Sequence, residues 1–450
     1  MGHDDASGLA ALTAVDAAAR IASGELSSQD LVSACLDRIA AQEPSVQAWA
    51  FLDRDRALEQ ARAADAQFKE SKGTGPLHGV PVGLKDIIDT ADMPTENGSD
   101  VFKGRQPAHD AACVTALRRA GAVILGKTVT TELATHIPSR TRNPVNLEHT
   151  PGGSSSGSAA AVAAGMVPVA VGTQTGGSVI RPAAFCGVYG FKPTFGTIPR
   201  TGVLTQSSTL DTIGVFGRTV EDVALATDAL QAYDARDAAS LSTSRPRLLA
   251  TATQDWPLPP LFAFVKTHAW SDTDAVTREA FGELVEELGG QVAEVSLDST
   301  TERGVAAART VQDVEMAAHY GPLLDRSPGQ FSKGLAARIE EGRRVNGVDY
   351  FAALDVRERF YANACEIFTG YGTILTPAAL GPAPKDLGTT GSPVCCAFWT
   401  YLGVPAVTLP LLEVDGMPLG VQLIGPRRDD GRLLRSARWL ARQFHQAGRA

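Results

Sequence analysis

Cysteine and aromatic residues are sparse in this chain, and long apolar runs are missing. Its six cysteines form no C-x-x-C pair and no Cys/His cluster with zinc spacing, which argues against a disulfide scaffold or a zinc site. The longest apolar stretch, near Ala159–Val171, is too short to cross a bilayer and contains Gly165 and Pro168. We therefore predict no membrane span and no metal. Reduced thiols, most of them in the core, are expected at Cys35, Cys113, Cys186, Cys365, Cys395 and Cys396.

An excess of positive charge is also missing. The chain has 41 lysines and arginines against 50 acidic residues, a formal net charge of −9, so its overall field would not attract a nucleic acid or an anionic membrane. The acidic start, Met1–Leu12, lacks the basic region and apolar stretch of a signal peptide. We expect a cytoplasmic protein that binds neither nucleic acid nor membranes.

Helix and strand patterns alternate along the chain, as they do in α/β folds. Hydrophobic residues make up 44% and charged residues 20%, which is typical of a globular protein with a sizeable core. The spacing of apolar residues predicts two helices within Thr13–Gln42, and Ala122–Leu125 is predicted to be a buried strand. Further along, Arg247–Ala252 is predicted as a strand and Thr301–Phe368 as mostly helical.

Two loops rich in glycine and serine, Gly152–Gly157 and Thr175–Ser178, flank the uncharged run Ala159–Val171. Glycine has no Cβ and tolerates positive φ, so both loops allow the backbone to approach a ligand closely. We interpret the run between them as a buried helix-to-strand connection that holds the loops together. This arrangement predicts a site built from both loops.

Two familiar patterns do not fit their surroundings. Gly121–Thr128 matches the phosphate-binding pattern G-x-x-x-x-G-K-[ST], but its central Ala-Val-Ile-Leu is the predicted strand rather than a turn. Gly153–Gly157 matches G-x-S-x-G with Ser155 at its centre, but a loop precedes it where a nucleophile elbow needs a buried strand. Nucleotide binding and an α/β-hydrolase site are therefore both disfavoured.

Lys85 lies in the strand-like run Val80–Ile88, where a lysine needs an explanation. In one interpretation its apolar stem lies along a sheet edge and its ammonium reaches water. In the other it is buried, desolvation lowers its pKa by up to roughly 3–5 units, and the neutral amine acts as a base. A serine hydrolase that lacks a catalytic histidine needs such a base.

Four motifs together resemble the amidase signature family. The resemblance extends from about Leu9 to Gly425 and is weakest between about Ala235 and Phe368. It favours the catalytic interpretation of Lys85. The motifs are Gly83-Leu84-Lys85-Asp86, Pro151–Ser158 (PGGSSSGS), Gly172–Gly187 (GTQTGGSVIRPAAFCG) and Gly190–Thr194 (GFKPT).

The resemblance implies a Ser–Ser–Lys triad. Ser178 matches the family's nucleophile, Ser154 its bridging serine, which usually follows a cis peptide bond, and Lys85 its general base. It implies neither a cofactor nor a metal. Two further sets of residues are implied: an oxyanion hole from the backbone of Thr175, Gly176, Gly177 and Ser178, and an acyl pocket lined by Ala134, Thr135 and His136.

Three positions near the triad qualify this resemblance. Gln174 stands where many members have an aspartate, which removes a negative charge and bears on substrate preference more than on activity. Arg181 is expected to anchor the second loop rather than to bind substrate. Asp211 is expected to be structural.

The implied fold is α/β: a mixed, twisted central β-sheet covered on both faces by α-helices, in a single domain over residues 1–450. We expect an N-terminal helical layer at 1–70 and a catalytic core at 71–234. A variable region at 235–370 is expected to form a substrate lid, and 371–450 the C-terminal part of the core.

The implied function is hydrolysis of the C–N bond of an amide through an acyl-enzyme on Ser178. The expected substrate is a small hydrophobic or aryl amide or a carbamate (urethane), and the expected enzyme is a monomer or homodimer. Two alternatives stay open. One is the glutamine-hydrolysing subunit of a tRNA-dependent amidotransferase. The other is a non-catalytic binding protein on the same fold, which the presence of all three triad residues disfavours.

Overall fold

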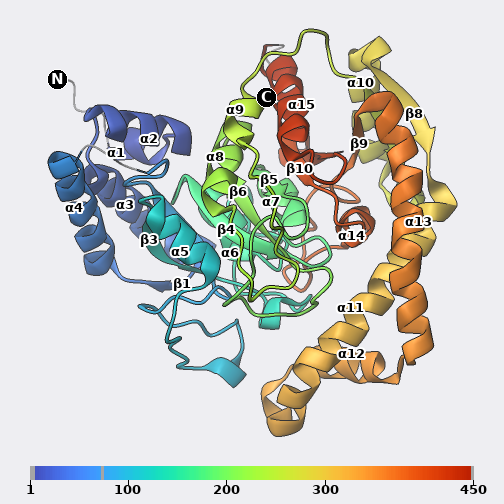
Figure 1. The fold of residues 1–450 in the computed structure, drawn as a ribbon, viewed down its shortest axis with the longest axis horizontal. Coiled ribbons are helices and arrows are strands. Elements are labelled where there is room, and N and C mark those ends of the chain that lie inside the picture. Colours follow the sequence, from blue (N-terminus) through green and yellow to red (C-terminus); the bar gives the residue numbers. More distant parts are fainter. Residues whose placement is uncertain (1–5, 72–74, 447–450) are drawn as a thin grey trace.

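The computed structural model describes residues 6–71 and 75–446 (Figure 1). Met1–Asp5, the first part of the acidic start, lie outside the described residues. In the described part of the chain, eleven strands form one sheet in the order β1-β3-β2-β4-β6-β5-β10-β11-β9-β7-β8. These strands are β1 Trp49–Leu52, β2 Pro81–Lys85, β3 Val123–Thr128, β4 Val169–Gln174, β5 Tyr189–Lys192, β6 Thr212–Gly217, β7 Phe262–Lys266, β8 Val292–Ser296, β9 Thr373–Pro377, β10 Ala406–Val414 and β11 Met417–Ile424.

The sheet is mixed. β2 runs parallel to both β3 and β4, and β7 runs parallel to β8 and β9. The pairs β1–β3, β4–β6, β5–β6, β5–β10, β10–β11 and β9–β11 are antiparallel. The carboxyl ends of β2 and β4 therefore lie side by side near the middle of the sheet, a place where α/β proteins commonly bind ligands.

Both faces of the sheet are buried under helices. Strand side chains point alternately to the two faces, and on β10 the neighbours Ala406 and Val407 accordingly enter two different apolar clusters. Helices α8 and α15 contribute to one cluster, and α13 and α14 contribute to the other. The prediction of a mixed sheet covered on both faces is confirmed. The helices are α1 Ala6–Ala10, α2 Ala14–Ser23, α3 Ser28–Val46, α4 Arg54–Ser71, α5 Ala112–Arg119, α6 Ser156–Ala163, α7 Ile180–Cys186, α8 Val220–Leu230, α9 Leu248–Ala252, α10 Ala275–Leu288, α11 Asp298–Arg326, α12 Lys333–Arg344, α13 Gly347–Tyr371, α14 Val394–Tyr401 and α15 Asp430–Gln446.

The helices predicted within Thr13–Gln42 are present as α2 and α3, at the left of Figure 1. Thr13 and Ser27 cap them, since each side chain accepts a hydrogen bond from a backbone N–H in the first turn. Their apolar faces, including Ile21 and Leu31, belong to the core cluster that also covers the first strands.

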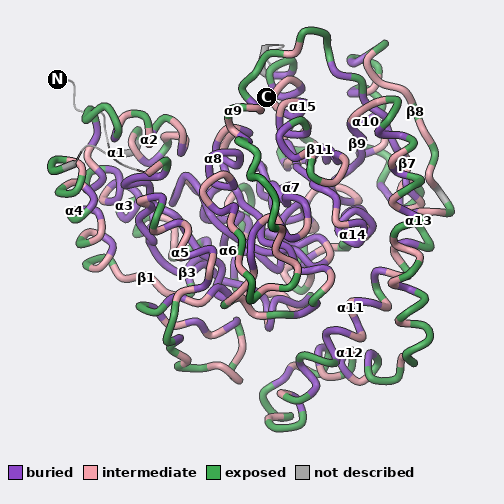
Figure 2. Tube along the Cα trace, in the orientation of Figure 1, coloured by how far each residue is buried: buried purple, intermediate pink, exposed green. Residues whose placement is uncertain are grey.

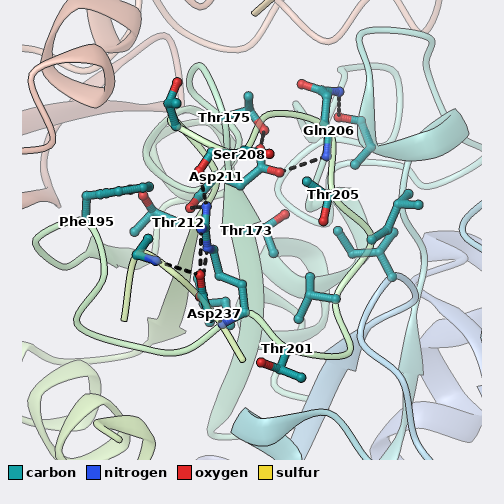
Figure 3. A pocket seen from close by; sticks show the side chains of 18 of the residues that line it. Thr173, Thr175, Phe195, Thr201, Thr205, Gln206, Ser208, Asp211, Thr212 and Asp237 are labelled. Carbon is teal, nitrogen blue, oxygen red and sulfur yellow. Dashed lines mark hydrogen bonds and ion pairs between the residues drawn. The ribbon is translucent and has the colours of Figure 1, made fainter. Parts of the chain in front are cut away.

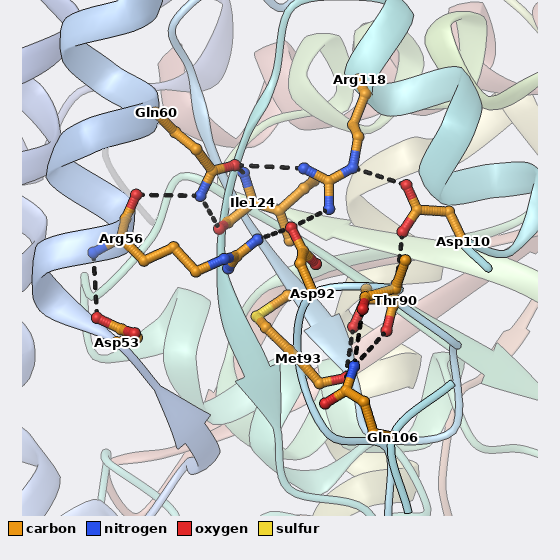
Figure 4. Close-up of polar contacts among 11 residues, drawn as sticks. Asp53, Arg56, Gln60, Thr90, Asp92, Met93, Gln106, Asp110, Arg118 and Ile124 are labelled. Carbon is orange, nitrogen blue, oxygen red and sulfur yellow. Dashed lines mark hydrogen bonds and ion pairs between the residues drawn. The ribbon is translucent and has the colours of Figure 1, made fainter. Parts of the chain in front are cut away.

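A cluster of charged side chains joins the N-terminal layer to the sheet (Figure 4). Arg118 of α5 donates to Asp110 at 2.8 Å and to Asp92 at 2.7 Å, and Arg56 of α4 also pairs with Asp92. Gln60, one turn after Arg56, donates to the carbonyl of Ile124 in β3 at 3.1 Å. These contacts are partly exposed, so each contributes little on its own, but together they fix how α4 and α5 lie against β3.

Helices α11, α12 and α13 form an arm, defined here as Asp298–Tyr371, at the right and bottom of Figure 1. Figure 2 shows more exposed residues along this arm than around α6 and α7. Met316 and Tyr320 of α11 belong to one apolar cluster with Leu335 and Ile339 of α12 and with Leu133 of the core. This cluster attaches the arm to the segment that follows β3.

The arm's second helix, α12, begins at Lys333 directly after its N-cap, Ser332, and it lies against α11. Residues 301–368 are therefore mostly helical, as predicted. Within the wider segment 235–370, β7 and β8 extend the sheet at one edge. The role of 235–370 as a substrate lid stays a prediction.

The strand predicted at Arg247–Ala252 is wrong, because Leu248–Ala252 forms the short helix α9. Asp228 of α8 accepts hydrogen bonds from the backbone N–H groups of Leu248 and Leu249 at 2.7 and 3.0 Å. A carboxylate at these N–H groups satisfies donors that the first turn of a helix leaves free. A tertiary contact from a separate helix thus overrides the apolar pattern of the segment.

Candidate active site

Lys85 is the last residue of β2, and its side chain is fully buried. Its Nζ donates to Ser154 Oγ at 2.7 Å and to Thr173 Oγ1 at 2.9 Å. Thr173 lies near the end of β4, the parallel neighbour of β2. The sheet-edge interpretation of Lys85 is therefore wrong, because β2 lies between β3 and β4 and the side chain does not reach the surface.

Ser154 lies in the first loop, just before α6, and is 1% exposed. The peptide bond between Gly153 and Ser154 is cis, as the resemblance implied. The carbonyl of Ser154 accepts a hydrogen bond from the backbone N–H of Thr131 at 3.2 Å. The loop is thereby held to the segment that follows β3, and the Ser154 hydroxyl is held at the end of the Lys85 side chain.

Ser178 lies in the second loop, between β4 and α7, and is 9% exposed. The side chain of Gln174 shapes this loop, since its Oε1 accepts hydrogen bonds from the N–H groups of Val179 and Ile180 at 2.8 and 3.0 Å. Its Nε2 donates to Thr400 Oγ1 at 2.8 Å, and Thr400 in turn donates to the carbonyl of Gly176 at 2.7 Å. An uncharged amide at position 174 is thus used as a brace for the loop.

Arg181, in α7, joins the two loops. Its guanidinium donates to the carbonyl of Gly153 in the first loop and to the carbonyl of Thr390, both at 2.7 Å. The side chain is 4% exposed and lies against Gly177, where a Cβ would come within 2.9 Å of Nη1. These bonds agree with the anchoring role predicted for Arg181, and they explain why the loop needs glycine at position 177.

The electrostatics of the site favour an uncharged lysine. Burial lowers the pKa of Lys85 to about 7, because the ammonium form loses its hydration, and the negative charge of Asp211 opposes this shift. Both atoms bonded to Nζ are neutral hydroxyl oxygens, so neither holds the amine in its charged form as a carboxylate would. Near neutral pH a large share of the protein therefore carries an amine that can accept a proton from Ser154.

A cavity of about 640 Å³ lies beside Thr173, the residue that binds Lys85 (Figure 3). Lys85, Ser154 and Ser178 are not among the described residues that line it. Thr173, Thr175 and Asp211 line it, and Ala134 lines it as well. Of the other two residues predicted for the acyl pocket, Thr135 is buried and His136 is exposed, and neither is among the described residues that line this cavity. Ala134 is therefore the member of the predicted pocket that the structure brings to the same cavity as Thr173 and Thr175.

Several residues of the site had no role predicted from the sequence. Thr173 bonds Lys85, and Thr390 and Thr400 support the two loops from a part of the chain more than 200 positions away. For Thr173 a signal was present, because it is a polar residue of the motif Gly172–Gly187 and closely follows the apolar run Val169–Val171. For Thr390 and Thr400 we find no local signal.

Neither a metal cluster nor a membrane helix accompanies the site in the described residues. No three His, Cys, Asp or Glu side chains there converge as they would around a metal ion. Across the same residues, no helix is both long and apolar enough to span a bilayer.

Comparison with known proteins places this geometry in a family. The family model described as "Amidase" matches residues 30–434. The A subunit of glutamyl-tRNA(Gln) amidotransferase from Chloroflexus aggregans is 34% identical over 464 aligned residues, covering 94% of each chain. The corresponding protein of Symbiobacterium thermophilum is 35% identical and covers 92% of this chain and 93% of its own.

Solved structures agree with these relatives. One solved structure superposes with a TM-score of 0.90 at 27% identity, covering 98% of this chain and 99% of its own. It is described as an inhibitor-bound form of "an unexpected vestigial protein complex" that reveals the evolutionary origins of an s-triazine catabolic enzyme. The peptide amidase of Stenotrophomonas maltophilia superposes with a TM-score of 0.83 at 28% identity, covering 97% of both chains. This chain belongs to the amidase signature family, and it is an amidohydrolase that acts on carbon–nitrogen bonds.

Proposed function

We propose that Ser178 is the nucleophile, Ser154 the bridging serine and Lys85 the general base of this amidohydrolase. The observation that carries the proposal is the 2.7 Å contact between Lys85 Nζ and Ser154 Oγ, both of which belong to buried side chains. Neutral Lys85 takes the proton of Ser154 while Ser154 takes the proton of Ser178, and the Ser178 oxygen attacks the amide carbonyl. The proton then returns through Ser154 to the leaving nitrogen, and water hydrolyses the acyl-enzyme.

The backbone amides of Thr175, Gly176, Gly177 and Ser178 are proposed as donors to the developing oxyanion. The loop is braced on both sides, by Thr400 at the carbonyl of Gly176 and by Gln174 at the start of α7. Donors that are already fixed need no reorganisation as charge develops, and losing one typically costs about 2.7–4 kcal/mol of barrier. The bracing contacts are therefore part of the proposed catalytic arrangement.

For the substrate, we propose first the side-chain carboxamide of glutamine, with release of ammonia, in a complex with other subunits. The support is the similarity to the A subunits of the amidotransferases, which extends over nearly the whole of both chains. The expectation of a hydrophobic or aryl amide or a carbamate has less support from the relatives. The proposal replaces the monomer or homodimer with a larger assembly.

A second candidate is a free-standing hydrolase of small amides. The similarity to the peptide amidase, at a TM-score of 0.83 and 28% identity, supports this candidate. Free glutamine carries an ammonium and a carboxylate, which usually need charged partners where they are desolvated. Charged side chains, including Arg200, Asp211 and Arg357, line the cavity beside Thr173 and Thr175, so the cavity lining does not by itself separate the two candidates.

One set of assays separates the two candidates. Ammonia release is measured with glutamine, asparagine, peptide amides, aryl amides and carbamates, using the purified chain and the chain copurified from its native host. Glutamine turnover that requires a copurifying protein supports the first candidate, and turnover of uncharged amides by the chain alone supports the second. Ser178→Ala should remove all turnover with the fold intact, whereas full activity in this variant contradicts the proposed mechanism.

A further inference from the structure

Asp211, expected from the sequence to be structural, accepts a hydrogen bond from Thr175 of the second loop and lines the same cavity as Thr173, whose hydroxyl binds Lys85. We propose that Asp211 is a positioning residue that holds the oxyanion loop through Thr175 and sets the electrostatic field at Lys85. This inference rests on the roles proposed above for Thr175 and Lys85. It assigns to one carboxylate two effects on catalysis that can be measured separately.

The geometry of Asp211 is that of a fully engaged carboxylate. Thr175 Oγ1 donates to its Oδ1 at 2.6 Å, and the backbone N–H groups of Gln206 and Ser207 donate to its Oδ2 at 2.8 and 2.9 Å. Burial raises the pKa of Asp211, and these three hydrogen bonds oppose that shift. The two backbone groups can only donate, so they favour the ionised carboxylate, which accepts hydrogen bonds at both oxygens.

The charges around Asp211 allow its field to reach the lysine. Arg200 is the cation near it, but this guanidinium is bonded to both carboxylate oxygens of Asp237 and reaches Asp211 only at its backbone carbonyl, at 3.1 Å. The charge of Asp211 also acts on the buried Tyr320. Burial raises the pKa of Tyr320, and the negative charge of Asp211 raises it further. The contacts of Lys85 on β4 and in the first loop are uncharged, so Asp211 is the charge that opposes the effect of burial on its pKa.

The loop that holds Asp211 is itself anchored on two sides through Gln206, which Figure 3 shows bonded to Asp211. Gln206 Nε2 donates to the carbonyl of Ala134 at 3.2 Å, and its Oε1 accepts from Gln312 Nε2 of the arm at 2.7 Å. The Asp211 carboxylate is therefore fixed relative to the acyl-pocket segment and to α11. A shift of this loop would be passed to Thr175 through a single hydrogen bond.

The hydrogen bond and the charge can be removed one at a time. Thr175→Val deletes the donor to Asp211 and keeps the carboxylate, so the oxyanion loop loses its tether while the field at Lys85 stays. Asp211→Asn removes the charge, and its amide oxygen can still accept from Thr175. Its NH2 group then faces the N–H groups of Gln206 and Ser207, so those two hydrogen bonds are lost, and for this variant the midpoint of the pH profile is the quantity that is compared. Thr175→Ser keeps the hydroxyl and is the matched control for the first variant.

The test uses phenylmethylsulfonyl fluoride as the probe, so it does not depend on knowing the substrate. The reagent forms a bond from the serine oxygen to sulfur and releases fluoride, while the serine proton passes to the base, and mass spectrometry of the peptide that contains Ser178 counts the labelled fraction. The labelling rate is measured from pH 5 to 10, and thermal unfolding is measured for every variant.

We expect Thr175→Val to lower the labelling rate on the high-pH plateau roughly 10- to 100-fold, with an unchanged midpoint of the pH profile. Thr175→Ser should restore the plateau rate. We expect Asp211→Asn to move the midpoint to lower pH, because an anion that stabilises the ammonium of Lys85 is lost. A Thr175→Val plateau equal to the wild type, or an Asp211→Asn midpoint equal to the wild type, overturns the positioning role. If Asp211→Asn does not fold, the valine and serine pair still decides whether Asp211 positions the oxyanion loop through Thr175.

Failure of the proposed function has a different signature. If the Ser178 peptide is not labelled in the wild type, or Lys85→Met labels at the wild-type rate, the triad assignment is wrong. If the wild type labels at Ser178 in a lysine-dependent way and the Asp211 and Thr175 variants behave like the wild type, only the positioning role is wrong.

Discussion

Two buried lysines stand on neighbouring strands, and their surroundings differ in one respect. Lys127, in β3, donates to the carboxylate of Asp86 at 3.1 Å, to Thr95 Oγ1 at 2.6 Å and to the carbonyl of Pro94 at 3.2 Å. Lys85, in β2, meets two hydroxyls and no carboxylate. Burial lowers the pKa of both amines, but for Lys127 the adjacent Asp86 opposes the shift directly.

This difference bears on the role of base that is proposed for Lys85. Lys127 forms a buried ion pair, in which the carboxylate stabilises the ammonium. Next to Lys85, two hydroxyl groups take the place of the carboxylate. The amine can therefore exist uncharged next to Ser154, the serine that has to lose a proton in the proposed mechanism. A third buried lysine, Lys192, has its pKa lowered to about 7 as well, but its Nζ donates to the carbonyls of Val404 and Pro193. These carbonyl groups have no proton that Lys192 could remove, whereas Lys85 contacts the hydroxyl of Ser154.

Removing the proposed base should have the largest effect. Lys85→Met approximately keeps the volume of the side chain, and we expect kcat/KM to fall by about 10²–10⁴-fold because the general base is lost. The melting temperature should stay equal or rise, because the unfolded chain no longer gains from a solvated ammonium. Activity within tenfold of the wild type would contradict the role of Lys85.

Removing the ion-paired amine should instead damage the fold. Lys127→Met leaves the buried carboxylate of Asp86 without its cation, and we expect a loss of about 3–5 kcal/mol in the free energy of unfolding, measured with urea. Adding Asp86→Asn in the same chain should recover part of this loss. A loss below about 1 kcal/mol would mean that the pair is not buried in solution.

The wild-type pH profile should report the uncharged state of Lys85. Because the amine must be neutral to act, kcat/KM should rise with pH through about 7 and fall about tenfold for each pH unit below that value. The residual activity of Lys85→Met is the control, and it should lack this limb. A profile that is flat from pH 5 to 9 would count against a lysine base.

Placing a carboxylate beside Lys85 should make it resemble Lys127. Thr173→Asp puts an acid where a hydroxyl now lies 2.9 Å from Nζ, so the pKa of Lys85 should rise. We expect kcat/KM at pH 7 to fall about tenfold or more and to recover at higher pH. Thr173→Val removes the contact without adding charge, and its midpoint should not move upward. If the midpoint of the pH profile of kcat/KM is unchanged in Thr173→Asp, the comparison between Lys85 and Lys127 is refuted.

The smallest effect is expected at Ser155, which the G-x-S-x-G pattern marks as a nucleophile. Its Oγ donates to the carbonyl of Thr173 at 3.2 Å, so its role is to hold the start of α6 against β4. Ser155→Ala should lower kcat/KM less than about threefold and cost about 1 kcal/mol of stability, measured by urea unfolding. A loss as large as that of Ser178→Ala would restore the rejected nucleophile-elbow interpretation.

Local parts of this protein were predictable from neighbouring residues. The caps and apolar faces of α2 and α3, and the buried strand at Ala122–Leu125, depend on such short-range patterns. The connection between the two loops was also predicted, as the helix α6 followed by the strand β4. The proposed triad was found through its motifs, and the contact of Lys85 with Thr173 follows from the parallel pairing of β2 with β4.

Elements that depend on distant partners were not predictable. The strands β5 and β6 contain glycine in their interiors, at Gly190 and Gly214, which weakens a strand pattern read from local preferences. The helix α9 forms at a carboxylate from α8, and the bond between Asp211 and Thr175 spans 36 positions. Such contacts exist only once the sheet has brought their partners together.

Thr390 and Thr400, which support the two loops, are synthesised long after the residues of the proposed triad. One brace of the second loop, at the carbonyl of Gly176, needs Thr400, and one of the two carbonyls that Arg181 binds belongs to Thr390. A ribosome that has made the chain as far as α7 has therefore produced Lys85, Ser154 and Ser178 without these two contacts. The complete set of contacts around the proposed nucleophile can form only after the segment with Thr390 and Thr400 has been made.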